Sequence, residues 1–471
     1  MQWNFAKATW ALFICMTGFT ACHSLQFEAP EESYALSPPA AWKASAKGNQ
    51  GKISQGWLSD FHDPRMKAVV DRAMAQNQDL AAAAARMQEA EYLRIAGKSR
   101  GLPNVLLSSS GAYSMSGNGP AESSESERYG LNLSASWEVD VWKRLRDLNQ
   151  ADDADMASVR ALYRGARLSL AASAAKSWCN LIAAEQQLNL SKVILDSFER
   201  NLRISERNYV GTGQGSLDVQ FGRTNVAAAR RSLEASIQAR DEAARTLEVL
   251  CGDYPAGSSR AGSELPVLKK GVPAGIPAGL VERRPDLAAA RERIFATAKR
   301  ADASRKNLLP NIRLTGGGGN TVSNFNNLLD PSYLAASVAA SLAQTVYSGG
   351  ELSNVARASV ERNKAVINDY CQTALEAFRE VESTLSADTS LASQEVFLMT
   401  EVEQAQLAEK QSTRDYADGI EGSDILDVLE AQRRDNNARL SLIRLRNQRL
   451  QNRIDLHLAL GGDFRTEDSA K

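Results

Sequence analysis

The segment from Glu351 to Asp418 contains neither glycine nor proline over 68 consecutive residues. Because these residues are the usual helix breakers, the segment predicts one continuous helix, roughly 100 Å long at about 1.5 Å per residue. Ser423 to Leu460 is a further stretch without either breaker, and two long helices are expected at about residues 145–250 as well. Helices of this length cannot wrap around a compact core, so they must pack side by side, as in a closed ring of helices.

Two hairpins of β-strands are predicted beside the helices, at about residues 105–139 and 312–346. In the first hairpin, small polar residues alternate with the apolar residues Leu131, Leu133, Ala135 and Trp137. Such a period of two over about ten residues is typical of a transmembrane β-strand. We expect the hairpin loops at Met115–Arg128 and Thr321–Tyr333, with the last strand at Leu334–Val346.

Four strands are too few to close a barrel, and lipid does not tolerate open strand edges. If these strands span a membrane, several chains must therefore share one barrel. The alternative is that the hairpins are small and soluble, and decorate a helical periplasmic protein.

The same landmarks occur twice along the chain. An Asp-Leu pair before a helix, a Leu-Pro-Asn before a strand and a tyrosine ending a long helix all recur 207 positions later, at Asp79 and Asp286, Leu102 and Leu309, and Tyr209 and Tyr416. Leu250–Tyr254 is similar to Leu460–Phe464, 210 positions later. The shared order and offset indicate two copies of one structural unit.

These landmarks divide the chain into six expected segments. In chain order they are a signal peptide (1–21), an N-terminal extended segment (22–64), a first repeat (65–255), a linker (256–285), a second repeat (286–464) and a C-terminal tail (465–471). Each repeat is expected to contain a helix, a β-hairpin and two long helices.

The first residues have the pattern of an export signal. Lys7 is followed by an apolar stretch from Ala8 to Phe19, which is too short to span a bilayer. The stretch ends in Phe-Thr-Ala-Cys22, which resembles the lipobox of bacterial lipoproteins and implies a diacylglycerol on the Cys22 thiol. His23 follows where an aspartate would favour retention in the inner membrane, and this fits sorting to the outer membrane. The alternative is an ordinary cleaved signal with an incidental cysteine.

Charge and composition exclude several classes of function. With 55 Lys and Arg against 56 Asp and Glu, the net charge is −1, which argues against nucleic-acid binding. The three histidines, His23, His62 and His457, lie far apart in the sequence, so a histidine-based catalytic or zinc site is not expected. Ser173 and Lys176 match the S-x-x-K of serine acylases, but they lie within a predicted helix and no companion motif follows. We expect no enzyme, no metal and no cofactor beyond the lipid on Cys22.

Three motifs resemble those of a known family, the TolC-like outer-membrane factors of tripartite efflux and type I secretion, in its lipoprotein branch. Pro273–Leu287, PAGIPAGLVERRPDL, is similar to the family's linker, and a Leu-Pro-Asn-Ile before a strand follows it. Trp137–Trp142, WEVDVW, resembles the WELDLW that ends the first hairpin, and Val346–Gly350 resembles the second corner. Lys143 stands where the family has glycine, which leaves the form of that strand-to-helix corner open.

This resemblance implies an α+β membrane protein that forms a homotrimer in the Gram-negative outer membrane. Four strands from each chain would make a 12-stranded transmembrane β-barrel, continued into the periplasm by a long α-helical barrel. The implied function is the outer-membrane channel of a tripartite efflux system, which receives substrates from an inner-membrane pump through a periplasmic adaptor. A type I secretion duct, or a lipid-anchored periplasmic scaffold or adaptor, is the alternative. The cargo stays open among drugs, solvents, metals and peptides.

The resemblance also implies a gate at the periplasmic end. Two glycine-bearing turns between the long helices would form its tip, with Gly211, Gly213 and Gly215 in one and Gly419 and Gly422 in the other. The first of these turns is expected to dock the adaptor.

Directly after the second turn, LDVLEAQR (residues 426–433) resembles the family's LDVLDAQR, whose acidic residues ring the closed pore. Asp427 and Glu430 are three positions apart, so both carboxylates share one helix face, and three chains would place six around one axis. Leu426 is a candidate apolar constriction, and Arg433 a candidate tether to a neighbouring helix. The alternative is a solvated acidic face on a surface helix.

Overall fold

The computed structural model of the chain describes residues 39, 41–44, 56–117, 124–212, 215–262, 264–268, 272, 279–418, 420, 422 and 424–462. The predicted signal peptide, Cys22, Gly213, Gly419 and residues 273–278 of the linker motif lie outside this described part. Within it, no helix combines the length and the apolar composition that crossing a membrane requires.

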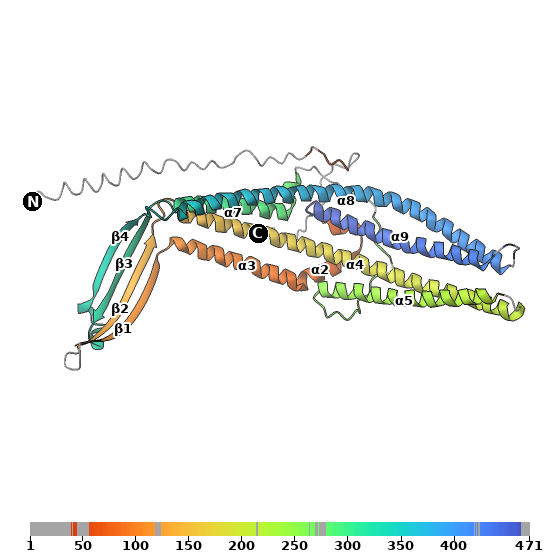
Figure 1. Ribbon diagram of the computed structural model, residues 1–471, viewed down its shortest axis with the longest axis horizontal. Helices are drawn as coiled ribbons and strands as arrows, with labels where there is room; N and C mark the ends of the chain where they lie inside the picture. Colours follow the sequence, from red (N-terminus) through yellow and green to blue (C-terminus); the bar gives the residue numbers. More distant parts are fainter. Residues whose placement is uncertain are drawn as a thin grey trace, which may run out of the picture. The chain divides into compact units, whose positions relative to one another are not determined.

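The elements follow each other in the same order twice (Figure 1). The first half consists of η2 (Trp57–Phe61), α2 (Pro64–Gln76), α3 (Gln78–Lys98), η3 (Ser99–Gly101), β1 (Asn104–Ser116), β2 (Ser124–Glu138), α4 (Arg144–Thr212) and α5 (Ser216–Leu250). The second half consists of α6 (Leu280–Arg283), α7 (Pro285–Lys306), β3 (Asn311–Val322), η5 (Phe325–Asn327), η6 (Pro331–Tyr333), β4 (Ala335–Ala343), α8 (Glu351–Ala417) and α9 (Ile425–Ala459).

Several expected boundaries differ from the structure. The second hairpin loop begins after Val322 and not at Thr321, because Thr321 and Val322 still pair with β2. The first hairpin loop is shorter than Met115–Arg128, because both of these residues pair within the extended ends of β1 and β2. The last strand ends at Ala343 rather than Val346, since its pairing partner β3 begins at Asn311, opposite Ala343. Gly211 lies inside the last turn of α4 and not in the turn that follows it.

The four strands form one sheet in the order β1-β2-β3-β4, with every neighbouring pair antiparallel. Since sequential strands pair with each other, β1 and β4 are the two edges. Their outer backbone groups have no strand partner within the described part of this chain.

The long helices run in pairs, with α4 against α5 and α8 against α9, and α4 also packs along α7, α3 and α9 (Figure 1). A large buried cluster lies where η2, α2, α4, α5 and α9 meet. Its core members include Phe61, Met66, Ile182, Leu247 and Ile454. This cluster fixes the middle of the helical part, because burying apolar side chains is the main favourable term in folding.

The two repeats are joined to their own long helices in the same way. Asn77 and Arg284, 207 positions apart, are the N-cap residues of α3 and α7. The Asn77 side chain donates to the carbonyl of Leu250 (3.0 Å), and the Arg284 guanidinium donates to the carbonyl of Ala459 (3.2 Å). Each repeat therefore ties the last residue of its final helix to the start of its short helix.

Arg284 also binds Asp286 and Glu380, each at 2.7 Å, so the arginine of the linker motif connects three helices. A glycine with positive φ follows each tie, Gly252 (75°) and Gly461 (73°). A Cβ on Gly252 would lie 2.5 Å from the carbonyl oxygen of Gln76. The two segments of the backbone therefore approach too closely there for any residue other than glycine.

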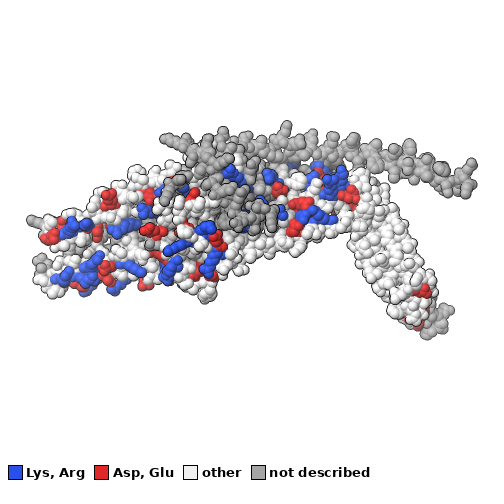
Figure 2. Space-filling view, turned by 180° about the vertical axis from the view of Figure 1, so that it is seen from behind, with Lys and Arg blue, Asp and Glu red and all other residues white. Residues whose placement is uncertain are grey.

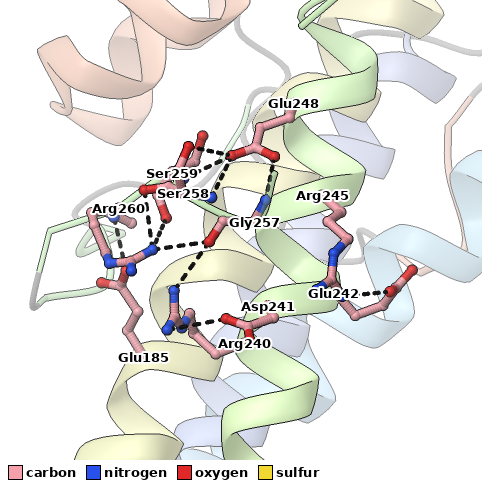
Figure 3. A network of polar contacts seen from close by, with 11 residues as sticks. Glu185, Arg240, Asp241, Glu242, Arg245, Glu248, Gly257, Ser258, Ser259 and Arg260 are labelled. Atoms are coloured by element: carbon pink, nitrogen blue, oxygen red, sulfur yellow. Dashed lines mark hydrogen bonds and ion pairs between the residues drawn. The ribbon is translucent and has the colours of Figure 1, made fainter. Parts of the chain in front are cut away.

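After α5 the chain is pinned back onto that helix by Glu248 (Figure 3). The buried Glu248 carboxylate accepts hydrogen bonds from the backbone N–H groups of Gly257, Ser258 and Ser259 at 2.7–2.8 Å. Although burial alone would raise it, these bonds lower the pKa of this carboxyl to about 2. The start of the linker is thus fixed by one ionised side chain.

The segment before the first repeat is bound to α8. Trp42 is buried with its ring 6.1 Å from that of Phe378, and the N–H groups of Lys43 and Ala44 each donate to the Glu382 carboxylate at 2.8 Å.

Candidate functional site

The sheet has one apolar and one polar face. Pairing places Leu107, Leu133, Gly318 and Ala336 in one row across the strands, and successive residues point to opposite faces. The face of this row, here called the apolar face, carries mainly large apolar side chains: Val105, Leu107, Tyr113, Met115, Tyr129, Leu131, Leu133, Trp137, Ile312, Leu314, Val338 and Leu342. The opposite, polar face carries mainly Ser, Thr, Asn, Gly and Ala, with Leu106 as its one large apolar exception between the charged residues at its ends.

Charged side chains are confined to the ends of the sheet. Between Tyr129 and Trp137 on β2, and over the residues that pair with this stretch, no Asp, Glu, Lys or Arg occurs on either face. Figure 2 shows the sheet as an uncharged surface with acidic residues at its far end, where Glu125 and Glu127 lie. The stretch from Tyr129 to Trp137 is about as long as the roughly 9–11 residues with which a tilted strand crosses the apolar part of a bilayer.

Among the glycines of the sheet, only those on the polar face come close to a neighbouring strand. A Cβ on Gly319 would lie 2.3 Å from the carbonyl oxygen of Leu131, and one on Gly317 would lie 3.1 Å from that of Leu133. On the apolar face, Cβ atoms on Gly316 and Gly318 would have their nearest neighbours at 3.7 and 3.5 Å. Gly317 and Gly319 thus pack closely against β2, whereas the nearest neighbours of Gly316 and Gly318 lie on β4.

At the predicted gate, the structure brings Leu426, Glu430 and Arg433 to one groove of about 600 Å³. Phe198 of α4 and Phe221 of α5 line its other side. Leu426 is half-exposed at this position, as an apolar constriction requires of a residue that meets other chains.

Glu430 is bound to two arginines of its own helix. Its carboxylate accepts two hydrogen bonds from Arg433 and one from Arg434, all at 2.8 Å. These guanidinium groups lower the pKa of the Glu430 carboxyl to about 2, and Glu430 in turn raises the pKa of Arg433. The predicted tether from Arg433 to a neighbouring helix is not present within the described part of this chain, because Arg433 pairs with Glu430 one helical turn away.

Asp427 has a different role in the single chain. Together with Asp424 it forms a capping box at the start of α9, in which Asp427 accepts from the N–H of Asp424. Asp427 and Glu430 share a helix face, but only Glu430 is compensated by arginines, so the local charge of this face differs from that of two free carboxylates.

The predicted tip glycines divide into three groups. Gly215 (φ 87°) and Gly422 (φ 89°) have the left-handed backbone that suits a tight reversal between helices. Gly211 is helical, while Gly213 and Gly419 lie outside the described residues. At the first strand-to-helix corner, Lys143 adopts φ 60° in place of the family's glycine, so the left-handed corner is kept without glycine.

A polar seam joins α4 and α9 and starts beside the groove. It was not identified from the sequence. Gln432 donates to Ser197 (3.2 Å), and both Asn447 (2.8 Å) and Gln451 (3.1 Å) donate to Asn180. All three of these contacts between α4 and α9 are hydrogen bonds between neutral groups.

Ion pairs join these helices elsewhere. Farther from the tip, α4 and α9 are connected by the ion pair of Lys176 with Asp455. By contrast, ion pairs join α8 and α9 over residues 446–453 of α9, such as that between Glu395 and Arg446 (2.9 Å). The two contacts of α9 therefore differ in chemistry over residues 446–453, where Asn447 and Gln451 bond to α4 and the arginines pair with α8.

Among the described residues, no three His, Cys, Asp or Glu side chains gather into a group that could hold a metal ion. The Cys22 thiol, the expected lipid site, lies outside these residues.

Comparison with known proteins places this geometry in context. Residues 69–253 and 277–462 match the family model described as outer membrane efflux protein. The chain is 28% identical over 449 residues to the pyoverdine export outer membrane protein OpmQ of Pseudomonas putida, covering 93% of this chain and 94% of that protein. It is 25% identical over 414 residues to the cation efflux system protein CusC of Escherichia coli, covering 87% and 88%. The solved Campylobacter jejuni CmeC outer membrane channel has the same fold, with a TM-score of 0.85, 22% identity and coverage of 93% of this chain and 94% of that one.

Proposed function

This chain belongs to the outer membrane efflux protein family, and we propose that three copies of it form one gated channel through the outer membrane. The observation that carries this proposal is the sheet, which is apolar on one face, polar on the other and open at both edges within the described part of the chain. Such a sheet is incomplete alone, because unpaired backbone groups in lipid cost several kcal/mol each.

Copies of this sheet can close on each other. The four strands alternate in direction, so β1 of one chain can lie antiparallel to β4 of the next, as in every pair within the chain. Three chains give a barrel of 12 strands, with the apolar faces toward lipid and the polar faces toward the lumen. A lumen lined by small neutral residues passes solutes without selecting them chemically, so we propose that an inner-membrane pump and a periplasmic adaptor determine the cargo.

The ends of the long helices form the proposed gate. Over residues 446–453 of α9, the α8–α9 hairpin is held together by ion pairs, whereas the contacts of Asn447 and Gln451 with α4 are hydrogen bonds between neutral groups. Neutral hydrogen bonds contribute only about 0.5–1.5 kcal/mol each. We therefore propose that opening separates α9 from α4 along the polar seam while α8 and α9 move together. A lipid on Cys22 would anchor the same chain to the membrane.

Conductance in planar bilayers tests the channel and its gate. We expect the purified full-length protein to have the mass of three chains and to conduct rarely. Asp427→Asn combined with Glu430→Gln is expected to raise the conducting fraction and lower the preference for cations. Glu403→Gln, which removes an exposed carboxylate from α8, is the matched control and should leave both unchanged.

Three results would contradict the proposal. A monomer in the soluble periplasmic fraction would favour a lipid-anchored scaffold or adaptor. Trimers that never conduct, even with both carboxylates replaced, would argue against this gate. If deleting this protein abolished the secretion of a protein substrate but left drug efflux intact, a type I secretion duct would be favoured.

A further inference from the structure

The segment between β3 and β4, Ser323–Leu334, is here called the outer loop. It contains η5 and η6 and a single charged residue, Asp330, whose carboxylate accepts from the N–H (2.9 Å) and hydroxyl (2.6 Å) of Ser332. Its large side chains are nevertheless exposed, with Leu329 78% and Phe325 63% accessible. An ordered loop with outward apolar side chains requires a partner that covers them.

The outer loop lies over the apolar face of the sheet. Asn320 and Val322 belong to that face by register, and both are buried. The Asn320 amide donates to the carbonyls of Leu328 and Asp330, each at 2.9 Å. The ring of Tyr129, on the same face, meets that of Phe325 edge to face at 5.4 Å.

The polar face is left uncovered at the same level. Thr321, which lies between Asn320 and Val322 but points to the polar face, is exposed. The outer loop therefore folds over the apolar face and leaves the polar face open at this level.

The height of the loop is fixed by strand pairing. Val322 pairs with Tyr129, at the end of the charge-free part of the sheet, and the first hairpin continues beyond it by the residues Ser124–Arg128. The outer loop is thus level with the aromatic end of the apolar face and lies below the acidic tip that carries Glu125 and Glu127.

We propose that the outer loop binds lipid. Asn320 holds the loop outward, so that Phe325, Leu329 and Tyr333 insert into the outer leaflet at its headgroup boundary. The lipid is the occupant because the loop continues the lipid-facing surface of the sheet and ends it with aromatic side chains, which favour membrane interfaces. This inference rests on the proposed barrel. It also implies that this loop does not close the external mouth of the channel.

Spin-label accessibility in proteoliposomes tests the position of the loop. One cysteine at a time replaces Phe325 or Leu329 in the outer loop, each in a Cys371→Ser background, in which Cys179 and Cys251 stay buried. Two reference positions are labelled in the same background, Leu133 on the mid-sheet apolar face and Glu125 at the acidic tip. We expect collisions with oxygen to exceed those with a water-soluble nickel chelate at positions 325, 329 and 133, and the reverse at position 125.

The outcomes separate this inference from the barrel itself. If labels at 325 and 329 collide mainly with the nickel chelate while the label at 133 collides mainly with oxygen, lipid binding by the outer loop is overturned and the proposed barrel stands. Low collision rates with both reagents at 325 and 329 would indicate burial against a neighbouring chain and would also overturn it. Nickel accessibility at position 133 would overturn the proposed barrel.

A second experiment tests the open mouth and the role of Asn320. Coupling a bulky thiol reagent to Leu329→Cys should leave the conductance of gate-opened trimers unchanged, while coupling to Thr321→Cys should reduce it. Asn320→Ala should shift the label at 329 toward nickel accessibility, and Thr321→Ala, the adjacent control on the polar face, should not. Block of conductance from position 329 would show that the loop reaches the lumen and would overturn the inference.

Discussion

At the scale of single residues, buried charge and left-handed glycine hold the joints between the repeats. Glu248 is almost fully buried, yet it is ionised because three N–H groups at the start of the linker point at its carboxylate. Its pKa of about 2 lies below the ordinary value, so its stabilising effect is complete above about pH 4.5 and is lost as the pH falls through 2.

Replacing this carboxylate should therefore destabilise the protein in a pH-dependent way. Glu248→Gln is expected to lower the free energy of unfolding at pH 7 by about 1–3 kcal/mol, because it removes hydrogen bonds to a charged acceptor. The deficit relative to the native protein should shrink as the pH falls toward 2, and thermal unfolding followed by circular dichroism measures it. Glu242→Gln, on the same helix but exposed, is the control and should have little effect at either pH.

The glycines of the two joints differ from other left-handed glycines in the space around them. Gly252→Ala combines a positive φ with a Cβ 2.5 Å from a backbone oxygen, whereas Gly349→Ala has a positive φ and no heavy atom within 4 Å. Gly349→Ala should cost about 1–2 kcal/mol from backbone strain, and Gly252→Ala about 1–3 kcal/mol more from overpacking. Equal unfolding temperatures for the two variants would show that the close approach at Gly252 is unimportant.

At the scale of elements, the helix pairs differ in what holds them. The pair α8–α9 has ion pairs over residues 446–453 of α9, and the polar contacts of Gln432, Asn447 and Gln451 with α4 join neutral amide and hydroxyl groups. This difference is the basis of the proposed opening along the α4–α9 contact.

Weakening the polar seam should therefore favour the open channel. Asn447→Ala removes the hydrogen bond to Asn180 and is expected to raise the ratio of open to closed channels about fivefold, which corresponds to about 1 kcal/mol. Asn368→Ala removes an amide that bonds only to its own helix, at the carbonyl of Lys364, and serves as the control. Single-channel recordings measure the ratio, and an unchanged open fraction in Asn447→Ala would argue against opening along this seam.

At the scale of the whole molecule, the two faces of the sheet decide how chains assemble in the membrane. Leu133 and Ser134 are neighbours on β2 and point to opposite faces. The proposed trimer places the first against lipid and the second in the lumen.

An arginine at each position should therefore have opposite consequences. Leu133→Arg is expected to reduce the yield of trimer in the outer-membrane fraction, because a cation at the bilayer midplane costs about 2–4 kcal/mol in each chain. Ser134→Arg should leave the yield of trimer unchanged and alter conductance and ion preference. Equal losses of trimer for both variants would contradict the assignment of the two faces.

Sequence reasoning identified the family, the four strands and the long helices, because each leaves a periodic or breaker-free pattern within one segment. Apolar residues two apart marked the lipid-facing side of β2, and the absence of glycine and proline marked α8. Strand ends were less well predicted, since the pairing of Met115 with Glu125 depends on both strands at once. The roles of Asp427, Glu430 and Arg433 in an assembled gate stay predictions, because they concern several chains.

The amino-acid sequence by itself determined the duplication and the family, since periodicity, helix breakers and motifs are local properties that are readable along the chain. Only the tertiary structure decided which distant residues meet. The same 207-residue offset that relates Asn77 to Arg284 gives no sign that both tie the ends of long helices, because their partners lie 173 and 175 positions away. Likewise, the outer loop has an ordinary loop sequence, and only the direction of Asn320 within the paired sheet decides that it folds over the apolar face.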